Sequence, residues 1–356
     1  MKTTHNRSRA FKQSTNTTVA RQPAIPFTRF SSLLPFISFF NNIGAPTDRF
    51  LRAAKISVSY KDSPNKHIPL HSAYLFAEHA ARSEGINNLG LTVGQNTSLA
   101  DLGPYGYLIQ QSSTIYEYLQ KGIRLIDSET SGQRFWLSEY DGELRFNSYI
   151  SGSSDYGRSQ ADMYALIITI NTLRKMVGDQ WSPRELYLAN IHSEKLADIP
   201  ALADTNITVG GKYSSFTLPR SMLKQAFHPA INHETSTDSI KQRLLSPLPV
   251  DFIIAISQIV EMLLLQGHSK VDLAAEAAGM TVRTLQRRLT EVGMSYTQLV
   301  NSTRVDIAAR WLKSSDMSIS AIASTLGYSD ASNFTRAFRR QTGISPQGFR
   351  EANTVH

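Results

Sequence analysis

The chain has 356 residues, with 37 Lys and Arg against 29 Asp and Glu and no cysteine. This length suits two domains better than one, and a hydrophobic content of 41% excludes a wholly disordered chain. The lack of cysteine excludes disulfides, a thiolate nucleophile and Cys-ligated metal sites. The net charge of +8 is concentrated in residues 1–60, whereas residues 281–350 carry ten Lys and Arg against four acids.

Residues 1–27 are rich in Thr, Ser, Asn, Lys and Arg and contain no acid. We predict a disordered basic tail that adds at most salt-sensitive, nonspecific attraction to DNA; a transit peptide, which has a similar composition, is the alternative. The apolar run over residues 33–40 predicts a core helix that ends at Gly44, followed by a short helix near residues 47–54. No segment reaches the ~20 apolar residues of a membrane span, so no membrane partner is expected.

Residues 28–245 are predicted to form an α+β domain of helices and a small antiparallel sheet. Apolar spacing indicates helices over residues 70–82, 115–126 and 160–177. Alternation around Asp141-Gly142 indicates a β-hairpin, and the predicted strands cover residues 135–140, 143–150, 185–191 and 212–218. His79 lies within the first of these helices, where we interpret it as a packed core residue rather than a ligand.

The sequence Ser-Pro-Leu-Pro at residues 246–249 predicts a linker, and residues 250–353 are predicted to be all α-helical. A sequence pattern occurs twice in this region, over about residues 270–291 and 318–341. Each copy fits a helix-turn-helix, with an alanine at the helix crossing, a glycine in the turn and a hydroxyl residue that caps the second helix. The matched residues are Ala275, Gly279, Thr281, Leu285 and Leu289 in the first copy and Ala323, Gly327, Ser329, Phe334 and Phe338 in the second.

The second helix of each copy has a polar face opposite its apolar pair. Long polar and hydroxyl side chains on such a face suit the base edges and phosphates of a DNA major groove. A continuous helix over residues 296–312, about 25 Å long, would hold the two recognition helices in successive major grooves. The predicted DNA-binding residues are Thr281, Arg283, Thr284, Gln286, Arg287, Ser329, Ser332, Thr335, Arg336, Arg339 and Arg340.

The second copy carries a specific motif that runs from Ile322-Ala323 through Leu326-Gly327-Tyr328-Ser329-Asp330, Asn333-Phe334, Arg336-x-Phe338-Arg339-Arg340 and Gly343-Ile344-Ser345-Pro346 to Phe349-Arg350. With it, residues 250–350 resemble the AraC/XylS family of bacterial transcription regulators. Ala331 stands where many members have a larger residue, which bears on the bases that the second module reads. Upstream stretches such as Leu89-Gly90-Leu91-x-Val93-Gly94 and Trp181-x-Pro183 resemble the arabinose-binding-like effector and dimerisation domain of one branch of this family.

The resemblance implies a cytoplasmic, homodimeric activator that binds a double-stranded DNA operator, contacts RNA polymerase and responds to a small-molecule effector. We assign no effector-binding residue, and we expect no cofactor and no metal. The alternative is a regulator controlled by its own abundance, whose N-terminal domain only dimerises or contacts partners. We expect no catalysis, because the sequence has no phosphate-binding glycine loop, paired Ser, His and Asp residues, or helical His pair.

Overall fold

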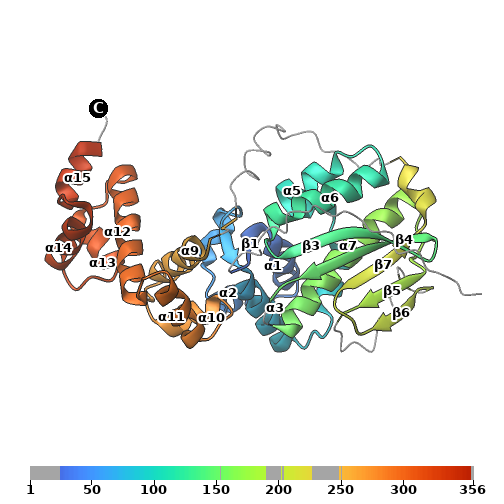
Figure 1. The fold of residues 1–356 in the computed structure, drawn as a ribbon, viewed down its shortest axis with the longest axis horizontal. Coiled ribbons are helices and arrows are strands. Elements are labelled where there is room, and N and C mark those ends of the chain that lie inside the picture. Colours follow the sequence, from blue (N-terminus) through green and yellow to red (C-terminus); the bar gives the residue numbers. More distant parts are fainter. Residues whose placement is uncertain are drawn as a thin grey trace, which may run out of the picture.

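The computed structural model describes residues 25–152, 154–189, 202, 204–226, 248–249 and 251–353. Figure 1 shows an N-terminal part, in which helices lie against a sheet, and beside it a run of short helices that leads to the C-terminus. Most of the predicted tail, residues 1–24, lies outside the described residues. The same holds for residues 246–247 of the predicted linker. Ile25 and Phe27, at the end of that predicted tail, are buried, so the packed chain begins before residue 28.

The N-terminal part starts with a two-stranded sheet and a small helical layer. Strand β1 (Phe27–Arg29) pairs antiparallel with β2 (His67–Pro69). The elements between the two strands are η1 (Phe30–Leu33), α1 (Leu34–Asn42), α2 (Thr47–Ala53) and η2 (Val58–Asp62). The helix predicted before Gly44 and the short helix that follows it are both confirmed, because their apolar residues form one buried cluster with the next helix.

The helices that follow are α3 (Leu70–Glu84), α4 (Leu89–Asn96), η3 (Leu99–Leu102), α5 (Gly103–Gln110), α6 (Ile115–Glu129) and α7 (Asp155–Val177). Thr114 caps α6, because its side chain accepts a hydrogen bond from the backbone N–H of Glu117. The interpretation of His79 is wrong. Its side chain is exposed on α3, since the buried face of that helix passes through Phe76, Ala77 and Ala80.

The sheet contains β3 (Gln133–Tyr140), β4 (Glu143–Ile150), β5 (Glu185–Leu188), β6 (Asn206–Val209) and β7 (Ser214–Leu218), in the order β3-β4-β7-β5-β6. The predicted α+β architecture is confirmed, and the hairpin turns at Asp141-Gly142 as predicted. One edge differs from the predicted antiparallel sheet, because β6 pairs parallel with β5. Side chains of β6 are mostly exposed, so its sequence lacks the alternation that reveals a half-buried strand.

The main core of the N-terminal part lies between the sheet and the helices. Phe146 on β4 and Phe216 on β7 pack with centroids 5.4 Å apart, in one buried cluster with Leu166 and Ile170 of α7. The short 3-10 helix η5 (Arg220–Lys224) follows β7. Figure 1 shows α7 lying along the sheet, with α5 and α6 above it.

The C-terminal part is all α-helical, as predicted. Its elements are α9 (Phe252–Leu264), α10 (Val271–Ala277), α11 (Val282–Glu291), α12 (Tyr296–Ser314), α13 (Ile319–Thr325), α14 (Ala331–Thr342) and α15 (Pro346–Asn353). Helix α12 has 19 residues, which gives a length of about 28 Å, and it separates the pair α10 and α11 from the pair α13 and α14 (Figure 1). Within the described ranges, no helix combines the length and the apolar character needed to cross a membrane.

The two parts touch through the first helices of the C-terminal part. Ile25, Phe27 and Leu248 belong to the buried cluster that contains the apolar residues of α9. The Gln266 side chain donates a hydrogen bond to the backbone carbonyl of Lys55, with an N–O distance of 3.1 Å. The start of the N-terminal part is therefore packed directly against the C-terminal helices.

Candidate functional site

Helix α11 is the second helix of the first helix-turn-helix. Gly279 adopts a φ of +66°, a left-handed conformation that suits glycine in a tight turn. Thr281 then caps α11, because its hydroxyl accepts a hydrogen bond from the backbone N–H of Thr284 at 3.2 Å. Leu285 and Leu289 are fully buried, as predicted, so the opposite face of α11 points to solvent.

The solvent face of α11 carries the predicted contact residues of the first copy. Arg283, Gln286 and Arg287 are exposed, and Thr284 is half-buried. The Arg287 guanidinium lies 3.9 Å from the Glu291 carboxylate, and both groups are exposed. Such a surface pair is weak, so Arg287 is free to exchange this partner for a phosphate or a base.

The second copy differs from the prediction in its cap. The N-cap of α14 is Asp330 and not Ser329, because Asp330 accepts a hydrogen bond from the Asn333 backbone N–H at 2.7 Å. That hydrogen bond lowers the pKa of Asp330. The second turn is one residue longer than the first, which accounts for the shift in the repeat offset from 48 (Thr281 to Ser329) to 49 (Leu285 to Phe334).

Asn333 connects the cap of α14 to the predicted contact residue Arg336. Its side-chain amide donates hydrogen bonds to Ser329 and Asp330, each at 2.7 Å. Its carbonyl oxygen accepts a hydrogen bond from the Arg336 guanidinium at 2.5 Å. Sequence reasoning left Asn333 out of the site, although it sits one turn before Arg336 on the same helix, where side chains three residues apart are neighbours.

The other predicted residues of the second copy lie on the same face of α14. Ser332, Arg336, Arg339 and Arg340 are exposed. Thr335 is half-buried, and its hydroxyl donates to the Ala331 carbonyl at 2.8 Å. Arg287 on α11 and Arg336 on α14 occupy matched positions in the two copies, and both side chains are exposed.

Aromatic packing holds α14 on the rest of the C-terminal part. Phe334 and Phe338 are fully buried, and Phe338 packs edge-on against Phe349 of α15 with centroids 5.4 Å apart. Arg304 of α12 lies over the ring of Tyr328 at 5.2 Å. The second recognition helix is thus fixed to the long helix α12 that separates the two copies.

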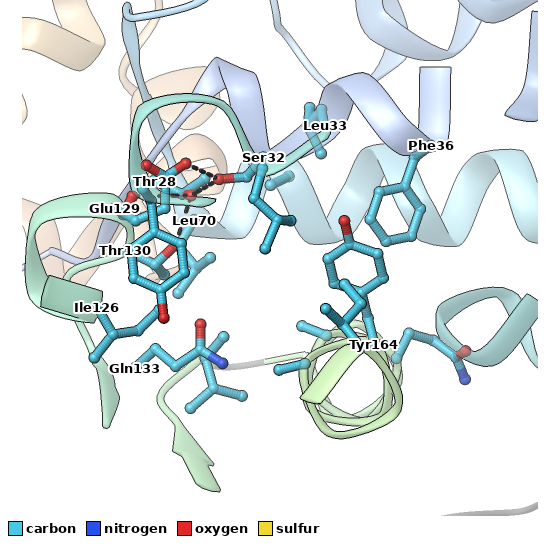
Figure 2. Close-up of a pocket in the computed structure, with 18 of the residues that line it drawn as sticks. Thr28, Ser32, Leu33, Phe36, Leu70, Ile126, Glu129, Thr130, Gln133 and Tyr164 are labelled. Atoms are coloured by element: carbon cyan, nitrogen blue, oxygen red, sulfur yellow. Dashed lines mark hydrogen bonds between the residues drawn. The ribbon is translucent and has the colours of Figure 1, made fainter. Parts of the chain in front are cut away.

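The N-terminal part contains a cavity of about 140 Å³. It lies among α1, α3, α5, α6 and α7, and its walls are mainly apolar. Figure 2 shows Phe36 and Tyr164 at one end and a polar group of Thr28, Ser32, Glu129 and Thr130 at the other. A concave, mainly apolar space with a few convergent polar groups is the usual form of a small-molecule site.

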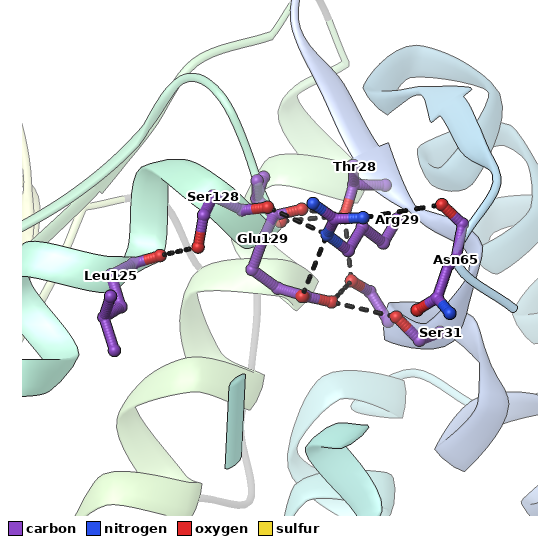
Figure 3. Close-up of polar contacts among 9 residues, drawn as sticks. Thr28, Arg29, Ser31, Asn65, Leu125, Ser128 and Glu129 are labelled. Carbon is purple, nitrogen blue, oxygen red and sulfur yellow. Dashed lines mark hydrogen bonds and ion pairs between the residues drawn. The ribbon is translucent and has the colours of Figure 1, made fainter. Parts of the chain in front are cut away.

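Glu129 is the centre of the polar end. Its carboxylate accepts hydrogen bonds from the hydroxyls of Ser31 at 3.1 Å and Ser32 at 2.8 Å, and its other oxygen lies 3.8 Å from the Arg29 guanidinium (Figure 3). Arg29 is fully buried and donates to the Ser128 carbonyl at 2.9 Å. Burial raises the pKa of Glu129, while Ser32 and Arg29 oppose that shift.

Strand β1 joins this cavity to the C-terminal helices. Thr28 lines the cavity, and its hydroxyl lies 2.8 Å from that of Thr130. The preceding residue, Phe27, belongs to the buried cluster of the C-terminal part, and the following residue, Arg29, pairs with Glu129. The polar end of the cavity and the C-terminal cluster thus meet at consecutive residues of one short strand.

Comparisons with known proteins match each of the two parts of the chain. A model described as the N-terminal arabinose-binding domain of AraC transcription regulators matches residues 44–227, and a helix-turn-helix domain model matches residues 274–352. The families and relatives matched are transcription regulators and not enzymes. Among the described residues, no group of three or more His, Asp and Glu side chains is placed to hold a metal ion.

Two curated relatives match nearly the whole chain. The ornithine utilization regulator of Pseudomonas aeruginosa is 23% identical over 92% of this chain and 96% of its own length. VirS of Mycobacterium tuberculosis, a helix-turn-helix transcriptional regulator, is 22% identical over 90% of this chain and 96% of its own length. A crystal structure of the transcriptional regulator CdpR from P. aeruginosa covers 86% of this chain and 96% of its own, at 21% identity and a TM-score of 0.38.

Proposed function

This chain belongs to the AraC family of transcription regulators, and from that premise we propose that it reads two successive major grooves under the control of a small molecule. DNA binding through the helix-turn-helix region follows from the family. The proposal itself covers which grooves the chain reads, which residues contact the DNA, that a ligand controls the chain, and that the chain activates transcription. The observation that carries it is the pair of matched recognition helices α11 and α14, each with its apolar face buried and its polar face exposed.

In this proposal, each recognition helix lies with its exposed face in a major groove. Arg287 and Arg336 take matched positions, where an arginine forms two hydrogen bonds to the O6 and N7 atoms of a guanine. Thr281, Arg283, Thr284 and Gln286 are the other proposed contacts of the first copy, and Ser329, Ser332, Thr335, Arg339 and Arg340 are those of the second. Arginines near the helix ends contact phosphates, which set register without reading sequence.

The spacing between the copies supports the reading of two grooves. Helix α12, about 28 Å long, stands between the two helix pairs. Successive major grooves on one face of a duplex are about 34 Å apart. In this proposal α12 separates the two recognition helices by about one helical turn, so that one chain covers two adjacent grooves.

Control by a ligand is supported by the cavity and by its connection to the C-terminal helices. Thr28 contributes to the polar end of the cavity and Phe27 packs against the cluster that includes α9. A ligand that binds one arrangement of β1 more tightly than another shifts the population of that arrangement. A regulator that is controlled only by its own abundance needs neither the cavity nor the contact between Phe27 and the C-terminal cluster. We therefore favour control by a ligand.

The remaining parts of the proposal rest on family membership. We propose a homodimer that contacts RNA polymerase in the cytoplasm and activates transcription, with an N-terminal domain over residues 28–245 and a DNA-binding domain over residues 250–353. The test is genome-wide mapping of the sites bound by the full chain and by the double variant Arg287→Ala, Arg336→Ala. We expect discrete bound sites that the double variant loses. Equal occupancy by both proteins would contradict the proposed readout.

A further inference from the structure

We propose that the cavity takes a compact apolar molecule with one head group that donates hydrogen bonds, either a hydroxyl or an amine, and that it rejects sugars and carboxylates. This inference rests on the proposed ligand control and names the chemical class of the ligand. It is carried by three observations: the size and walls of the cavity, the polar groups at one end, and the carboxyl group of Glu129 among the lining residues there.

The walls suit a small apolar body. The cavity of about 140 Å³ is comparable to an engineered apolar cavity of about 150 Å³ in another protein, which stays dry and binds benzene. Its lining includes the aromatic side chains of Phe36, Tyr74, Tyr105, Tyr118, Phe135 and Tyr164. A sugar carries hydroxyls on all sides, and apolar walls leave most of those hydroxyls without the hydrogen bonds that they have in water.

The polar end is where a head group binds. Glu129 and Gln133 are both buried and both line the cavity. The side-chain amide of Gln133 carries both a donor and an acceptor. Glu129 adds a carboxylate, and an ionised carboxylate only accepts hydrogen bonds. The matching head group is therefore a donor, and Thr28, Ser32 and Thr130 surround it with hydroxyls (Figure 2).

The charge at this end disfavours an anion. Of the described residues that line the cavity, none is Lys, Arg or His, and Glu129 is the one with a carboxyl group. Arg29 pairs with Glu129 but does not line the cavity, and it is itself fully buried. A carboxylate ligand would place a second negative charge beside Glu129 in a desolvated space without a cation of its own. An amine, in contrast, gains a charge-assisted hydrogen bond there.

The test is isothermal titration calorimetry of the full chain with four probes: 2-phenylethanol, 2-phenylethylamine, phenylacetate and L-arabinose. The first three share an aromatic body of the same kind and differ in the head group. We expect saturable 1:1 binding of the alcohol and the amine, and binding of phenylacetate and arabinose that is weaker by about tenfold or more.

Three variants locate the binding. Ala165→Leu fills the cavity from α7 and is expected to abolish binding of both the alcohol and the amine. Glu129→Gln is expected to weaken the amine by about tenfold and the alcohol less, because the amine alone also loses the attraction between two opposite charges. Glu139→Gln removes an exposed carboxylate of β3 and is the matched control, in which both affinities stay at the wild-type value.

Phenylacetate or arabinose binding as tightly as the alcohol would overturn the proposed ligand class, and so would the absence of any binding. Binding that survives in Ala165→Leu would overturn the location. If Glu129→Gln fails to fold, the four wild-type titrations still test the ligand class, and Ala165→Leu still tests the location of the site. These titrations contain no DNA, so they test the ligand class separately from ligand control. A probe that binds the chain but leaves its operator affinity unchanged would contradict ligand control and leave the ligand class intact.

Discussion

The side-chain carbonyl of Asn333 accepts a hydrogen bond from the Arg336 guanidinium, while the amide of the same Asn333 donates to Ser329 and Asp330. Asn333 therefore ties the proposed base-reading arginine to the N-terminus of its own helix. This contact restricts the rotamers of Arg336 before DNA arrives. Pre-ordering of a long side chain lowers the entropy cost of binding.

Asn333→Ala is expected to weaken operator binding by about 0.5–1.5 kcal/mol, the net value of one hydrogen bond. A mobility-shift titration measures the change. Asn353→Ala removes an amide from α15, away from the recognition face, and serves as the control. Unchanged affinity in Asn333→Ala, with a midpoint of thermal unfolding equal to the wild type, would contradict the positioning role.

Arg287→Ala and Arg336→Ala are each expected to cost about 1–3 kcal/mol of operator binding and to relax sequence preference at one position of the site. Truncation of a residue that only contacts phosphate would instead weaken binding to all sequences alike. Arg310→Ala is the control, since this exposed arginine of α12 pairs with Glu261. Competition with single-base operator variants distinguishes the two outcomes, and a uniform loss would assign both arginines to phosphates.

Asp330→Ala and Ser329→Ala test which residue caps α14. Loss of an N-cap costs about 0.5–2 kcal/mol, so we expect Asp330→Ala to lower the free energy of unfolding by this amount. Ser329→Ala is expected to change it by less than about 0.5 kcal/mol, as surface substitutions usually do. Urea denaturation of the full chain measures both, and a larger cost for Ser329→Ala would restore the hydroxyl cap expected from the repeat.

Asp162 gives a pH-dependent prediction. Burial raises its pKa to about 6, against the hydrogen bonds from Ser148 and Ser214. Between about pH 4 and pH 6 the folded state thus keeps a proton that the unfolded state has already released. The Asp162 carboxyl therefore makes the folded state progressively less stable as the pH rises through this range, and its destabilising effect is complete at pH 7.

Asp162→Asn is therefore expected to stabilise the chain at pH 7 by about 1–3 kcal/mol, and by much less at pH 4.5. Urea denaturation at the two pH values gives the difference. The matched control is Asp155→Asn, which removes an exposed carboxylate at the start of α7. Equal effects of Asp162→Asn at both pH values would show that its carboxyl titrates normally in the fold.

The repeat made the C-terminal part predictable from sequence. Turn glycines, caps and apolar pairs recur there at fixed spacing, so local patterns determine each helix and its buried face. The exception is instructive: Ser329 matched Thr281 by residue type, but the extra residue in the second turn moved the cap to Asp330. The contact between Asn333 and Arg336 depends on rotamers, which spacing alone does not specify.

The cavity was not predictable in the same way. Thr28 and Glu129 are about a hundred residues apart in the chain and meet only because β1 lies beside the end of α6. Tyr118 of α6 belongs to the buried cluster and also lines the cavity, and apolar spacing alone does not separate these two roles. Likewise, the parallel strand β6 has its partner β5 some twenty residues away and almost no buried side chain to reveal it.

Hydroxyl-radical footprinting of the full chain, on an operator selected from random DNA, tests the two-groove readout most directly. We predict two protected patches on one face of the duplex, about 10 base pairs apart, each sensitive to one of the substitutions Arg287→Ala and Arg336→Ala. A single protected patch that only one of the two substitutions removes would contradict the account.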